Sequence, residues 1–370
     1  MPKKNFKTID GKKYKLPMFF PDATRAVVKT LDSRDVTETK TEGVLANTFH
    51  LWMNPGEKVV KSFGGVRKFM NWEGAAISDS GGFQIMSLIK KSGGKVTDEG
   101  IKFQPENSPK LTFTPEDSMR NQFALKTDLI VVLDDFTPPD ATKKEAEETI
   151  ERTLKWAKRC KAEYEKHSKK TGLKPYLIAV AQGGKYQELR ELCTKELVKI
   201  GFDGIGYGGW PINSKGTFDY KSAKTISDNV PEDYLLYGLG IGMPEDIVGM
   251  VKIGWQIFDC VIPTRDARHG RLFAFNATSF DQIDLEKKNF YEYLYFPKQK
   301  YATEKSPICE LCDCHTCKNY SLGYLNHLFK IGDMSAMRLS TIHNLRFYSM
   351  LMEKLQKPNN HEGEKHKKRD

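Results

Sequence analysis

The chain has 370 residues, which is enough for one large α/β domain with an added element or for two ordinary domains. Hydrophobic residues make up 39% and charged residues 29%, and no apolar run approaches the roughly 20 residues of a membrane helix. Residues 1–13 are polar and lysine-rich and lack the apolar segment of a signal peptide, so we expect a cytoplasmic protein without membrane contact. The net charge of +10 favours an anionic partner, nucleic acid before others.

Short apolar runs alternate with longer helical patterns through most of the chain. The predicted strands are residues 43–46, 75–79, 129–135, 176–182, 203–209, 234–242 and 257–263. Predicted helices cover residues 143–168 and 185–200, surround Lys221 and begin at Pro244. Unbroken apolar strands are typical of a parallel sheet that is buried on both faces. Their alternation with helices predicts right-handed βαβ units.

These units fit either a closed (β/α)8 TIM barrel or an open doubly wound sheet. Polar residues stand at the ends of four predicted strands, namely Asp79, Asp134, Gln182 and Asp259. Barrel active sites are assembled in this way from the carboxyl ends of several strands. No GxGxxG sequence follows the first strand, which weakens the dinucleotide-binding alternative. We therefore expect an α/β fold with a TIM barrel over residues 1–306.

A cysteine cluster follows the predicted barrel, with Cys309, Cys312, Cys314 and Cys317 in one short stretch. In a cytosolic chain this spacing indicates a metal site rather than disulfides, and such thiolates suit tetrahedral Zn²⁺. Residues 320–355 look helical and carry His327 and His343. Either histidine, or the fourth cysteine, could complete a structural site with one zinc per chain.

Two further segments follow from this pattern. We expect a zinc-binding subdomain with its closing helix at residues 307–353. Residues 354–370 are charged and almost without apolar side chains, which predicts a disordered tail. A role in solubility explains this tail more simply than RNA binding does.

Two aspartates stand out as candidates for chemistry. Asp79 follows a predicted strand and precedes Gly81 and Gly82, and glycines let a backbone approach a ligand closely. Asp259 lies within a hydrophobic strand, where an isolated charge is costly unless it is paired or used. Structural roles are open for both residues. Asp79 could cap a helix, and Asp259 could pair with an arginine such as Arg265.

Taken together, the chain resembles the bacterial-type tRNA-guanine transglycosylases, also called queuine tRNA-ribosyltransferases. The resemblance runs from the LPMFFP sequence at residues 16–21 to the Phe347–Tyr348 pair. The matching motifs are NTFHL (47–51), DSGGFQ (79–84), DEGIKF (98–103), QGG (182–184), FDCVIPTR (258–265) and the CxCxxC cluster with a later His-Asn pair. Several motifs in one order are far more specific than any single motif.

The resemblance implies roles for individual residues. Asp259 aligns with the nucleophile that forms a covalent RNA–enzyme intermediate, Asp79 with the acid/base residue, and Asn47 with the residue that orients the nucleophile. The residues aligned with base contacts are Ser80, Phe83, Asp134, Gln182, Gly209, Trp210 and Leu239, of which Phe83 would stack on the base. Arg265 and Arg268 align with tRNA-binding arginines, and Cys312, Cys314, Cys317 and His343 align with the zinc ligands, which leaves Cys309 outside.

The implied activity is exchange of the wobble guanine of tRNA for a 7-deazaguanine in queuosine biosynthesis. We expect an ionised Asp259 held by donors such as Asn47, and a pKa of Asp79 nearer neutrality. An ionised Asp134 would accept from N1–H and the 2-amino group of guanine. A homodimer formed through the zinc subdomain is also implied. We expect Lys318, Lys330 and Arg338 to contact tRNA phosphates.

The chain departs from the family pattern at three places. Phe136 stands where cysteine or a small apolar residue is usual, Trp210-Pro211-Ile212 replaces a run of smaller residues, and Asp266 replaces Asn or a small residue. The first two places would line the base pocket. Bulky side chains there favour a small substituent such as aminomethyl over the cyclopentene-diol of queuine, unless Phe136 and Trp210 point away from the base.

Three other functions fit the same sequence. A queuine-salvaging transglycosylase would differ only in the incoming base. A DNA-modifying relative fits less well, because the motifs match tRNA enzymes closely. A non-catalytic tRNA-binding partner subunit would not need both Asp79 and Asp259, and both are present.

Overall fold

The computed structural model describes residues 3–92, 94–105, 109–213 and 216–357. Eight parallel strands form one sheet in the order β3-β13-β12-β11-β10-β9-β5-β4. They are β3 (Met18–Pro21), β4 (Gly43–Ala46), β5 (Ala75–Ser78), β9 (Leu129–Val131), β10 (Tyr176–Ala181), β11 (Gly204–Tyr207), β12 (Leu235–Gly238) and β13 (Ile257–Cys260). The two ends of this order, β3 and β4, also meet. Asp22 bridges to Leu45, and Ala23 N–H donates to the Leu45 carbonyl at 2.7 Å. The predicted TIM barrel is confirmed.

Alternation along each strand separates two cores. In β3, Met18 and Phe20 belong to the cluster inside the barrel, and Phe19 belongs to the cluster between strands and helices. A hairpin of β1 (Asn5–Lys7) and β2 (Lys13–Lys15) closes one end of the barrel with the buried ring of Phe6. In this hairpin, Lys7 N–H donates to the hydroxyl of Tyr176, the first residue of β10, and Ile9 N–H donates to Asp128, which precedes β9. The hairpin therefore covers the amino ends of the strands. The carboxyl ends form the open mouth.

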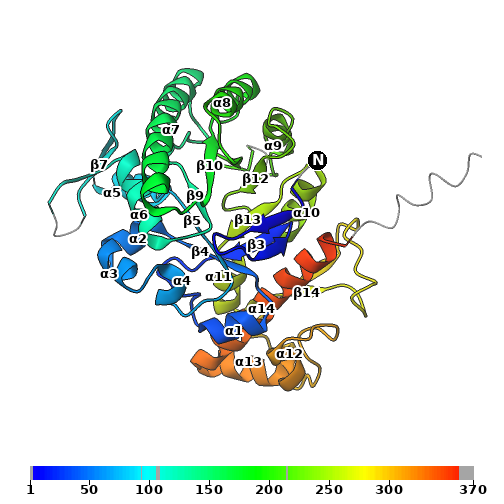
Figure 1. Ribbon diagram of the computed structural model, residues 1–370. Coiled ribbons are helices and arrows are strands. Elements are labelled where there is room, and N and C mark those ends of the chain that lie inside the picture. The colour runs from blue at the N-terminus through cyan, green and yellow to red at the C-terminus, as the bar shows by residue number, and fades with distance from the viewer. Residues whose placement is uncertain (1–2, 93, 106–108, 214–215, 358–370) are drawn as a thin grey trace, which may run out of the picture.

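Helices surround the sheet (Figure 1). They are α1 (Ser33–Glu38), α2 (Thr48–Met53), α3 (Glu57–Ser62), α4 (Val66–Phe69), α5 (Gly82–Ser92), α6 (Pro115–Leu125), α7 (Lys143–Thr171), α8 (Gln187–Ile200), α9 (Tyr220–Ser227), α10 (Pro244–Lys252) and α11 (Ile262–Arg268). The long helix α7 begins with a capping box between Thr142 and Glu145 and ends at Gly172, whose φ is 74°. The predicted helices after β9, β10, β11 and β12 are confirmed.

Smaller sheets and three helices complete the fold. A three-stranded antiparallel sheet consists of β6 (Lys95–Val96), β7 (Ile101–Phe103) and β8 (Leu111–Phe113). After α11 come the hairpin of β14 (Arg271–Phe275) and β15 (Tyr291–Tyr295), the turn η1 (Gln299–Tyr301), α12 (His315–Asn319), α13 (Leu322–Ile331) and α14 (Met334–Leu355). Figure 1 shows α12 and α13 in orange below the barrel and α14 in red along its side.

Several predicted boundaries were wrong. The strand predicted over residues 257–263 ends at Cys260, because Pro263 belongs to the first turn of α11. The helix predicted over residues 320–355 is two helices, which are separated at Gly332 in the left-handed region and at Asp333, the N-cap of α14. The eighth strand, β3, was not predicted as a strand.

The first residues of the predicted disordered tail are helical, because Lys354 and Leu355 belong to α14. Residues 358–370 of that segment lie outside the described residues. The division of the chain at residues 306 and 353 stays a prediction. Among the described residues, no helix combines the length and apolarity required to cross a bilayer.

Candidate functional site

The barrel mouth gathers the carboxylates that the sequence singled out. Asp79 directly follows β5, Asp134 follows β9, and Asp259 is the third residue of β13. All three side chains are partly buried, whereas Gln182 at the end of β10 is fully buried. Because parallel strands place their carboxyl ends at one rim, these groups share one site.

Asp79 is held by the start of α2. Asn47 Nδ2 donates to one carboxylate oxygen at 2.6 Å, and Thr48 N–H donates to the other at 2.9 Å. The Asn47 side chain also caps α2, because its oxygen accepts from His50 N–H at 2.9 Å. The cap therefore fixes which end of the amide faces Asp79. Asp79 thus accepts the N–H of the first residue of α2, while the N-cap of that helix is Asn47.

Asp259 has a different set of donors. The Tyr237 hydroxyl donates to Asp259 Oδ1 at 2.7 Å, and Gly240 N–H donates to the same oxygen at 3.0 Å. The expectation that Asn47 holds Asp259 was wrong, because the Asn47 amide donates to Asp79 instead. Tyr237 was missed at the sequence level. Its only signal was a hydroxyl-bearing side chain at an inward-facing position of an apolar strand.

Burial changes the proton affinity of this carboxylate pair. Burial raises the pKa of Asp79 to about 7, and the charges of Asp259 and Asp22 act in the same direction. Burial also raises the pKa of Asp259 to about 6, although the hydrogen bonds from Gly240 and Tyr237 favour its ionised form. Near neutral pH, Asp259 is therefore mostly ionised, while Asp79 can both give and take a proton.

A second carboxylate–amide pair lies on the neighbouring strands. Gln182 Nε2 donates to Asp134 Oδ2 at 2.6 Å, and Gln182 Oε1 accepts from Thr137 N–H at 3.0 Å, which fixes the orientation of the amide. Burial raises the pKa of Asp134 to about 7. The hydrogen bond from Gln182 opposes this rise, because it favours the ionised form of Asp134.

Aromatic side chains stand beside these polar groups. Phe83, in the first turn of α5, is 50% exposed, and its ring meets the ring of Phe136 edge-on at a centroid distance of 5.2 Å. Phe136 therefore points toward the predicted stacking residue and not away from it. Trp210 is 53% exposed and follows Gly209, whose φ is 83°.

The remaining predicted base contacts lie close in the chain to these groups. Ser80 is buried, its carbonyl accepts from the Ser118 hydroxyl at 2.8 Å, and its own hydroxyl accepts from Gly82 N–H at 3.3 Å. Leu239 is partly buried between Tyr237 and Gly240, which both hold Asp259. These placements put Ser80 beside Asp79 and Leu239 beside Asp259 along the chain.

The arginines after β13 differ in their partners. Arg265 Nε lies 3.2 Å from Asp266, which also pairs with Arg271 at 3.3 Å, so Asp266 holds two arginines. Within the described part of the chain, Arg268 Nη1 is buried without a hydrogen-bond partner. Of the more distant basic residues, Arg338 already makes a two-point ion pair with Asp35. Arg338 is thus less available to phosphate than we expected.

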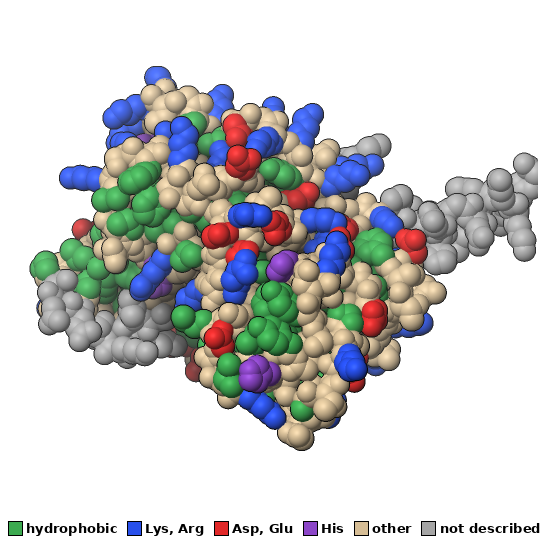
Figure 2. Space-filling view, turned by 90° about the horizontal axis from the view of Figure 1, so that it is seen from below, with side chains coloured by type: hydrophobic (Ala, Val, Ile, Leu, Met, Phe, Trp, Pro, Cys, Tyr) green, Lys and Arg blue, Asp and Glu red, His purple; other side chains and the backbone are tan. Residues whose placement is uncertain are grey.

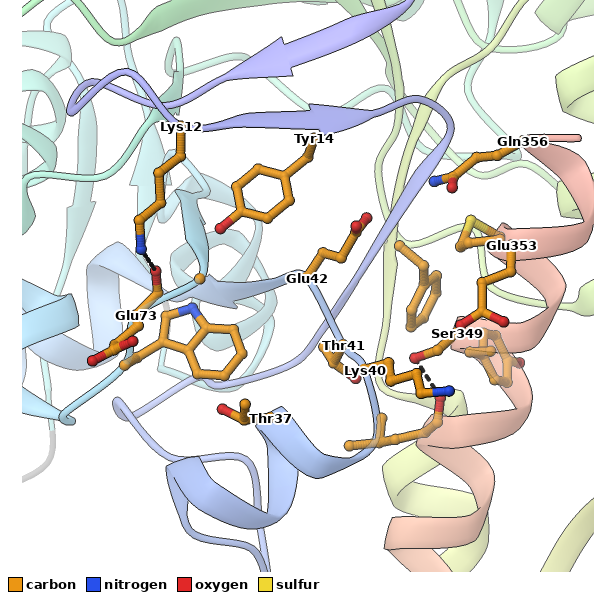
Figure 3. A pocket seen from close by; sticks show the side chains of 16 residues that line it. Lys12, Tyr14, Thr37, Lys40, Thr41, Glu42, Glu73, Ser349, Glu353 and Gln356 are labelled. Atoms are coloured by element: carbon orange, nitrogen blue, oxygen red, sulfur yellow. Dashed lines mark hydrogen bonds between the residues drawn. The ribbon is translucent and has the colours of Figure 1, made fainter. Parts of the chain in front are cut away.

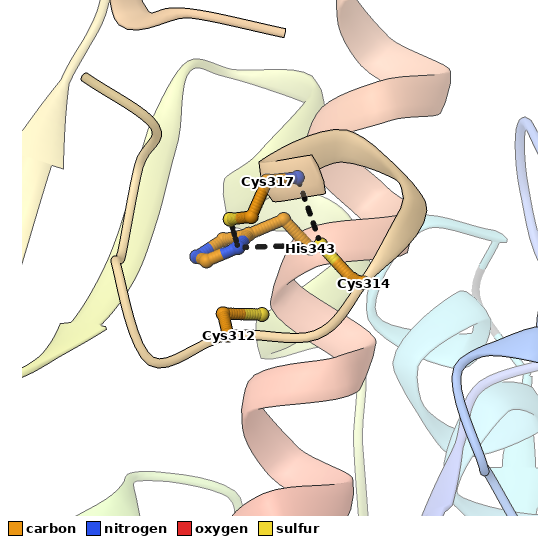
Figure 4. A group of neighbouring side chains, drawn as sticks. All are labelled: Cys312, Cys314, Cys317 and His343. Atoms are coloured by element: carbon orange, nitrogen blue, oxygen red, sulfur yellow. Dashed lines mark hydrogen bonds between the residues drawn. The ribbon is translucent and has the colours of Figure 1, made fainter. Parts of the chain in front are cut away.

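Four side chains converge in the region of α12 and α14 (Figure 4). The ligand atoms of Cys312, Cys314, Cys317 and His343 all lie within 4.8 Å of one another. His343 Nε2 is 2.6 Å from the Phe273 carbonyl, an arrangement in which Nε2 donates and Nδ1 stays free to bind a metal. Nδ1 faces the Cys317 sulfur at 3.2 Å. Three thiolates and one imidazole fit a closed tetrahedral ion.

The structure also decides between the ligand alternatives. His343, and not His327, completes the cluster, since His327 is exposed. Cys309 is buried nearby but is not part of the group, as expected. The chain therefore has a candidate metal site with four protein ligands and no open position.

A cavity of about 480 Å³ lies elsewhere, between the β1–β2 hairpin and the end of α14. Figure 3 shows Tyr14, Glu42 and Glu353 around it. None of the predicted site residues lines this cavity. The candidate active site is thus located by its carboxylates and their donors and not by the volume of a cavity.

Comparison with known proteins agrees with this geometry. The family model described as Queuine tRNA-ribosyltransferase matches residues 5–358. Proteins named queuine tRNA-ribosyltransferase from Shewanella sp. (strain W3-18-1) and Haemophilus influenzae are each 39% identical, over 342 and 337 residues. These alignments cover 92% and 91% of this chain and 85% and 83% of the relatives. The chain belongs to the queuine tRNA-ribosyltransferase family, whose members are pentosyltransferases of the tRNA-guanine transglycosylase type.

Proposed function

We propose that this protein exchanges the wobble guanine of tRNA for a 7-deazaguanine through a covalent aspartyl–RNA intermediate, as a step of queuosine biosynthesis. The observation that supports it most is the pair Asp79 and Asp259 at one barrel mouth, each held by its own donors. Displacing a base from ribose passes through an oxocarbenium-like state, which a carboxylate can stabilise and trap.

The two carboxylates take different roles in this reaction. An oxygen of ionised Asp259 attacks C1′ of the nucleotide as the bond from C1′ to guanine breaks, and Asp79 gives a proton to the departing base. The incoming 7-deazaguanine then returns a proton to Asp79 and attacks C1′, which releases Asp259. The pKa values of about 6 and about 7 suit these roles, because Asp259 loses its proton first.

Recognition of the base is assigned to the second pair. Asp134 can accept hydrogen bonds from N1–H and the 2-amino group of guanine, and Gln182 orients it. Binding these donors favours the ionised form of Asp134, so its raised pKa would fall in the complex. Phe83 offers its half-exposed ring for stacking on a base that has left the anticodon loop.

The first prediction concerns the nucleophile. Asp259→Asn keeps the shape of the side chain but removes the charge that bonds to C1′, so exchange of labelled guanine should fall by at least about 10³-fold. A denaturing gel should show an RNA adduct for the wild type and none for this variant. Asp79→Asn is the matched control, which should still bind tRNA but turn over slowly because proton transfer is lost. If Asp259→Asn kept substantial exchange activity, Asp79 would become the leading candidate for the nucleophile.

The second prediction concerns the incoming base. Phe136 packs against Phe83, and its bulk beside the stacking residue would leave little space for a large substituent, so we propose 7-aminomethyl-7-deazaguanine as the substrate. Nucleoside mass spectrometry of tRNA after incubation with a panel of deazaguanines should find this base inserted and queuine excluded. Phe136→Ala should admit queuine, whereas Phe63→Ala, an exposed phenylalanine on the surface, should not. Efficient use of queuine by the wild type would contradict the proposal.

We further propose that the Cys312, Cys314, Cys317 and His343 cluster holds a structural Zn²⁺. Zinc would tie the loop before α12 to α14 and would take no part in the chemistry. The third prediction is therefore about one zinc per chain by elemental analysis. Cys312→Ser should lose the metal and lower the thermal midpoint, while Cys309→Ser should retain it. Zinc loss from Cys309→Ser would overturn this ligand set.

Contacts with tRNA are assigned to Arg265 and Arg268, which stand on α11 directly after the nucleophile strand. The unpartnered Arg268 Nη1 supports a phosphate or base contact there, because a buried guanidinium nitrogen without an acceptor is costly. The log–log salt dependence of tRNA binding measures such contacts. Salt-independent binding would refute them.

The fourth prediction concerns assembly, and we propose a homodimer through α13 and α14. Ile331 and Met334 at their junction are 60% and 82% exposed, and Tyr324 on α13 is also exposed. Figure 2 shows hydrophobic side chains on the face turned to the viewer, the lower side of Figure 1, where α13 lies. Multi-angle light scattering at micromolar concentration should give a dimer, and Met334→Glu should shift it toward monomer. Leu192→Glu on α8 is the control, and a monomeric wild type would sink the proposal.

A further inference from the structure

Asp22 lies where the barrel closes. It directly follows β3 and bridges to Leu45 of β4. On the other side of β3, Phe20 is the register partner of Asp259. Asp22 therefore stands between the strand that carries Asp259 and the strand that leads into Asn47.

The Asp22 side chain organises a turn that reaches Asp79. Asp22 Oδ1 accepts from Thr24 N–H at 3.1 Å and also from the Thr24 hydroxyl. The Thr24 carbonyl accepts from Asn47 N–H at 3.3 Å. Asn47 in turn donates its amide to Asp79 at 2.6 Å. A continuous hydrogen-bonded path thus connects Asp22 to Asp79 through Thr24 and Asn47.

We propose that Asp22 is a positioning residue for the exchange reaction, which holds Asn47 against Asp79 through the Thr24 turn and places a third negative charge beside the two catalytic carboxylates. This inference rests on the function proposed above. Asp22 itself touches neither the base nor C1′ in this scheme. It acts through the position and the proton affinity of other groups.

The surroundings of Asp22 support the effect of its charge. The ionisable groups that sense it are Asp79 and Asp259 at the ends of β5 and β13, His50 on α2, and Arg268 on α11. Arg25 and Lys29, from the segment after β3, act on His50 in the opposite sense. The charge of Asp22 raises the pKa of both Asp79 and Asp259, because like charges disfavour ionisation.

The charge is tested by Asp22→Asn, which keeps an oxygen for Thr24 and removes the negative charge. The kcat/KM for tRNA should be bell-shaped in pH, since Asp259 must be ionised and Asp79 protonated for guanine to leave. Removing the charge lowers both pKa values, so the whole bell should move to lower pH. A merely structural defect would lower its height without moving it.

The turn is tested by Asp22→Ala, which removes both the charge and the acceptor for Thr24. Its kcat should fall about tenfold below that of Asp22→Asn, because Asn47 is no longer fixed against Asp79. In an Asn47→Ala background the two Asp22 variants should have equal kcat, since the path has already been cut. If the kcat values of Asp22→Asn and Asp22→Ala still differed tenfold in this background, the proposed path through Asn47 would be wrong.

A measurement without turnover separates this inference from the proposed function. In protein with ¹³C-labelled aspartate, the Asp79 carboxyl resonance, assigned by its loss in Asp79→Asn, should titrate at lower pH in Asp22→Asn than in the wild type. If the wild type exchanged no guanine, the proposed function would fail while this titration still reported on Asp22. An unchanged Asp79 titration together with equal kcat for Asp22→Asn and Asp22→Ala would overturn the inference.

Discussion

Closure of eight short parallel strands is the constraint on which the site depends. The strands have three to six residues each, so a side chain at a strand end lies at the rim whichever strand it comes from. Asp79, Asp134 and Asp259 are far apart in the chain, yet they are brought to one mouth. The hairpin with Phe6 covers the other end, which leaves the rim as the exposed end of the barrel.

Burial at this rim also changes the proton affinity of the carboxylates that barrel closure brings together. A partly buried carboxylate loses hydration, so its charged form becomes less favourable unless donors compensate. Asp259 receives a tyrosine hydroxyl and a backbone N–H, and Asp79 receives an amide and a backbone N–H. Burial is the largest cause of both raised pKa values, and the charge of Asp259 raises the pKa of Asp79 further, against the backbone hydrogen bonds from Thr48 and Gly81. A pKa of about 6 for Asp259 and of about 7 for Asp79 is what their proposed roles as anion and proton carrier require.

The metal cluster is mechanically connected to this rim. His343 on α14 donates to the Phe273 carbonyl, and the next residue, Asn344, donates to the Pro263 carbonyl at 3.0 Å. Pro263 belongs to α11, which begins shortly after Asp259. Tyr348, one turn later on α14, donates to the Gly242 carbonyl at 2.5 Å. A metal that fixes His343 would therefore also fix the helix against the segments on both sides of Asp259.

The sequence by itself determined the fold class, most of the strands and the cysteine cluster, whereas the tertiary structure decided that His343 completes that cluster. Unbroken apolar runs, polar strand ends and tight thiol spacing are local patterns, and each depends on residues that are near in the chain. Boundaries were less certain, as with Pro263 and Gly332, because capping and packing decide where a helix starts and stops.

Only the tertiary structure decided which donor serves which carboxylate. Asn47 bonds to Asp79 rather than to Asp259, and Tyr237 was not recognised as a partner of Asp259. The raised pKa of Asp134 and the path from Asp22 through Thr24 to Asn47 were also invisible in the sequence. Hydrogen bonds and desolvation depend on distances between residues on different strands, and barrel closure sets those distances while no local pattern records them.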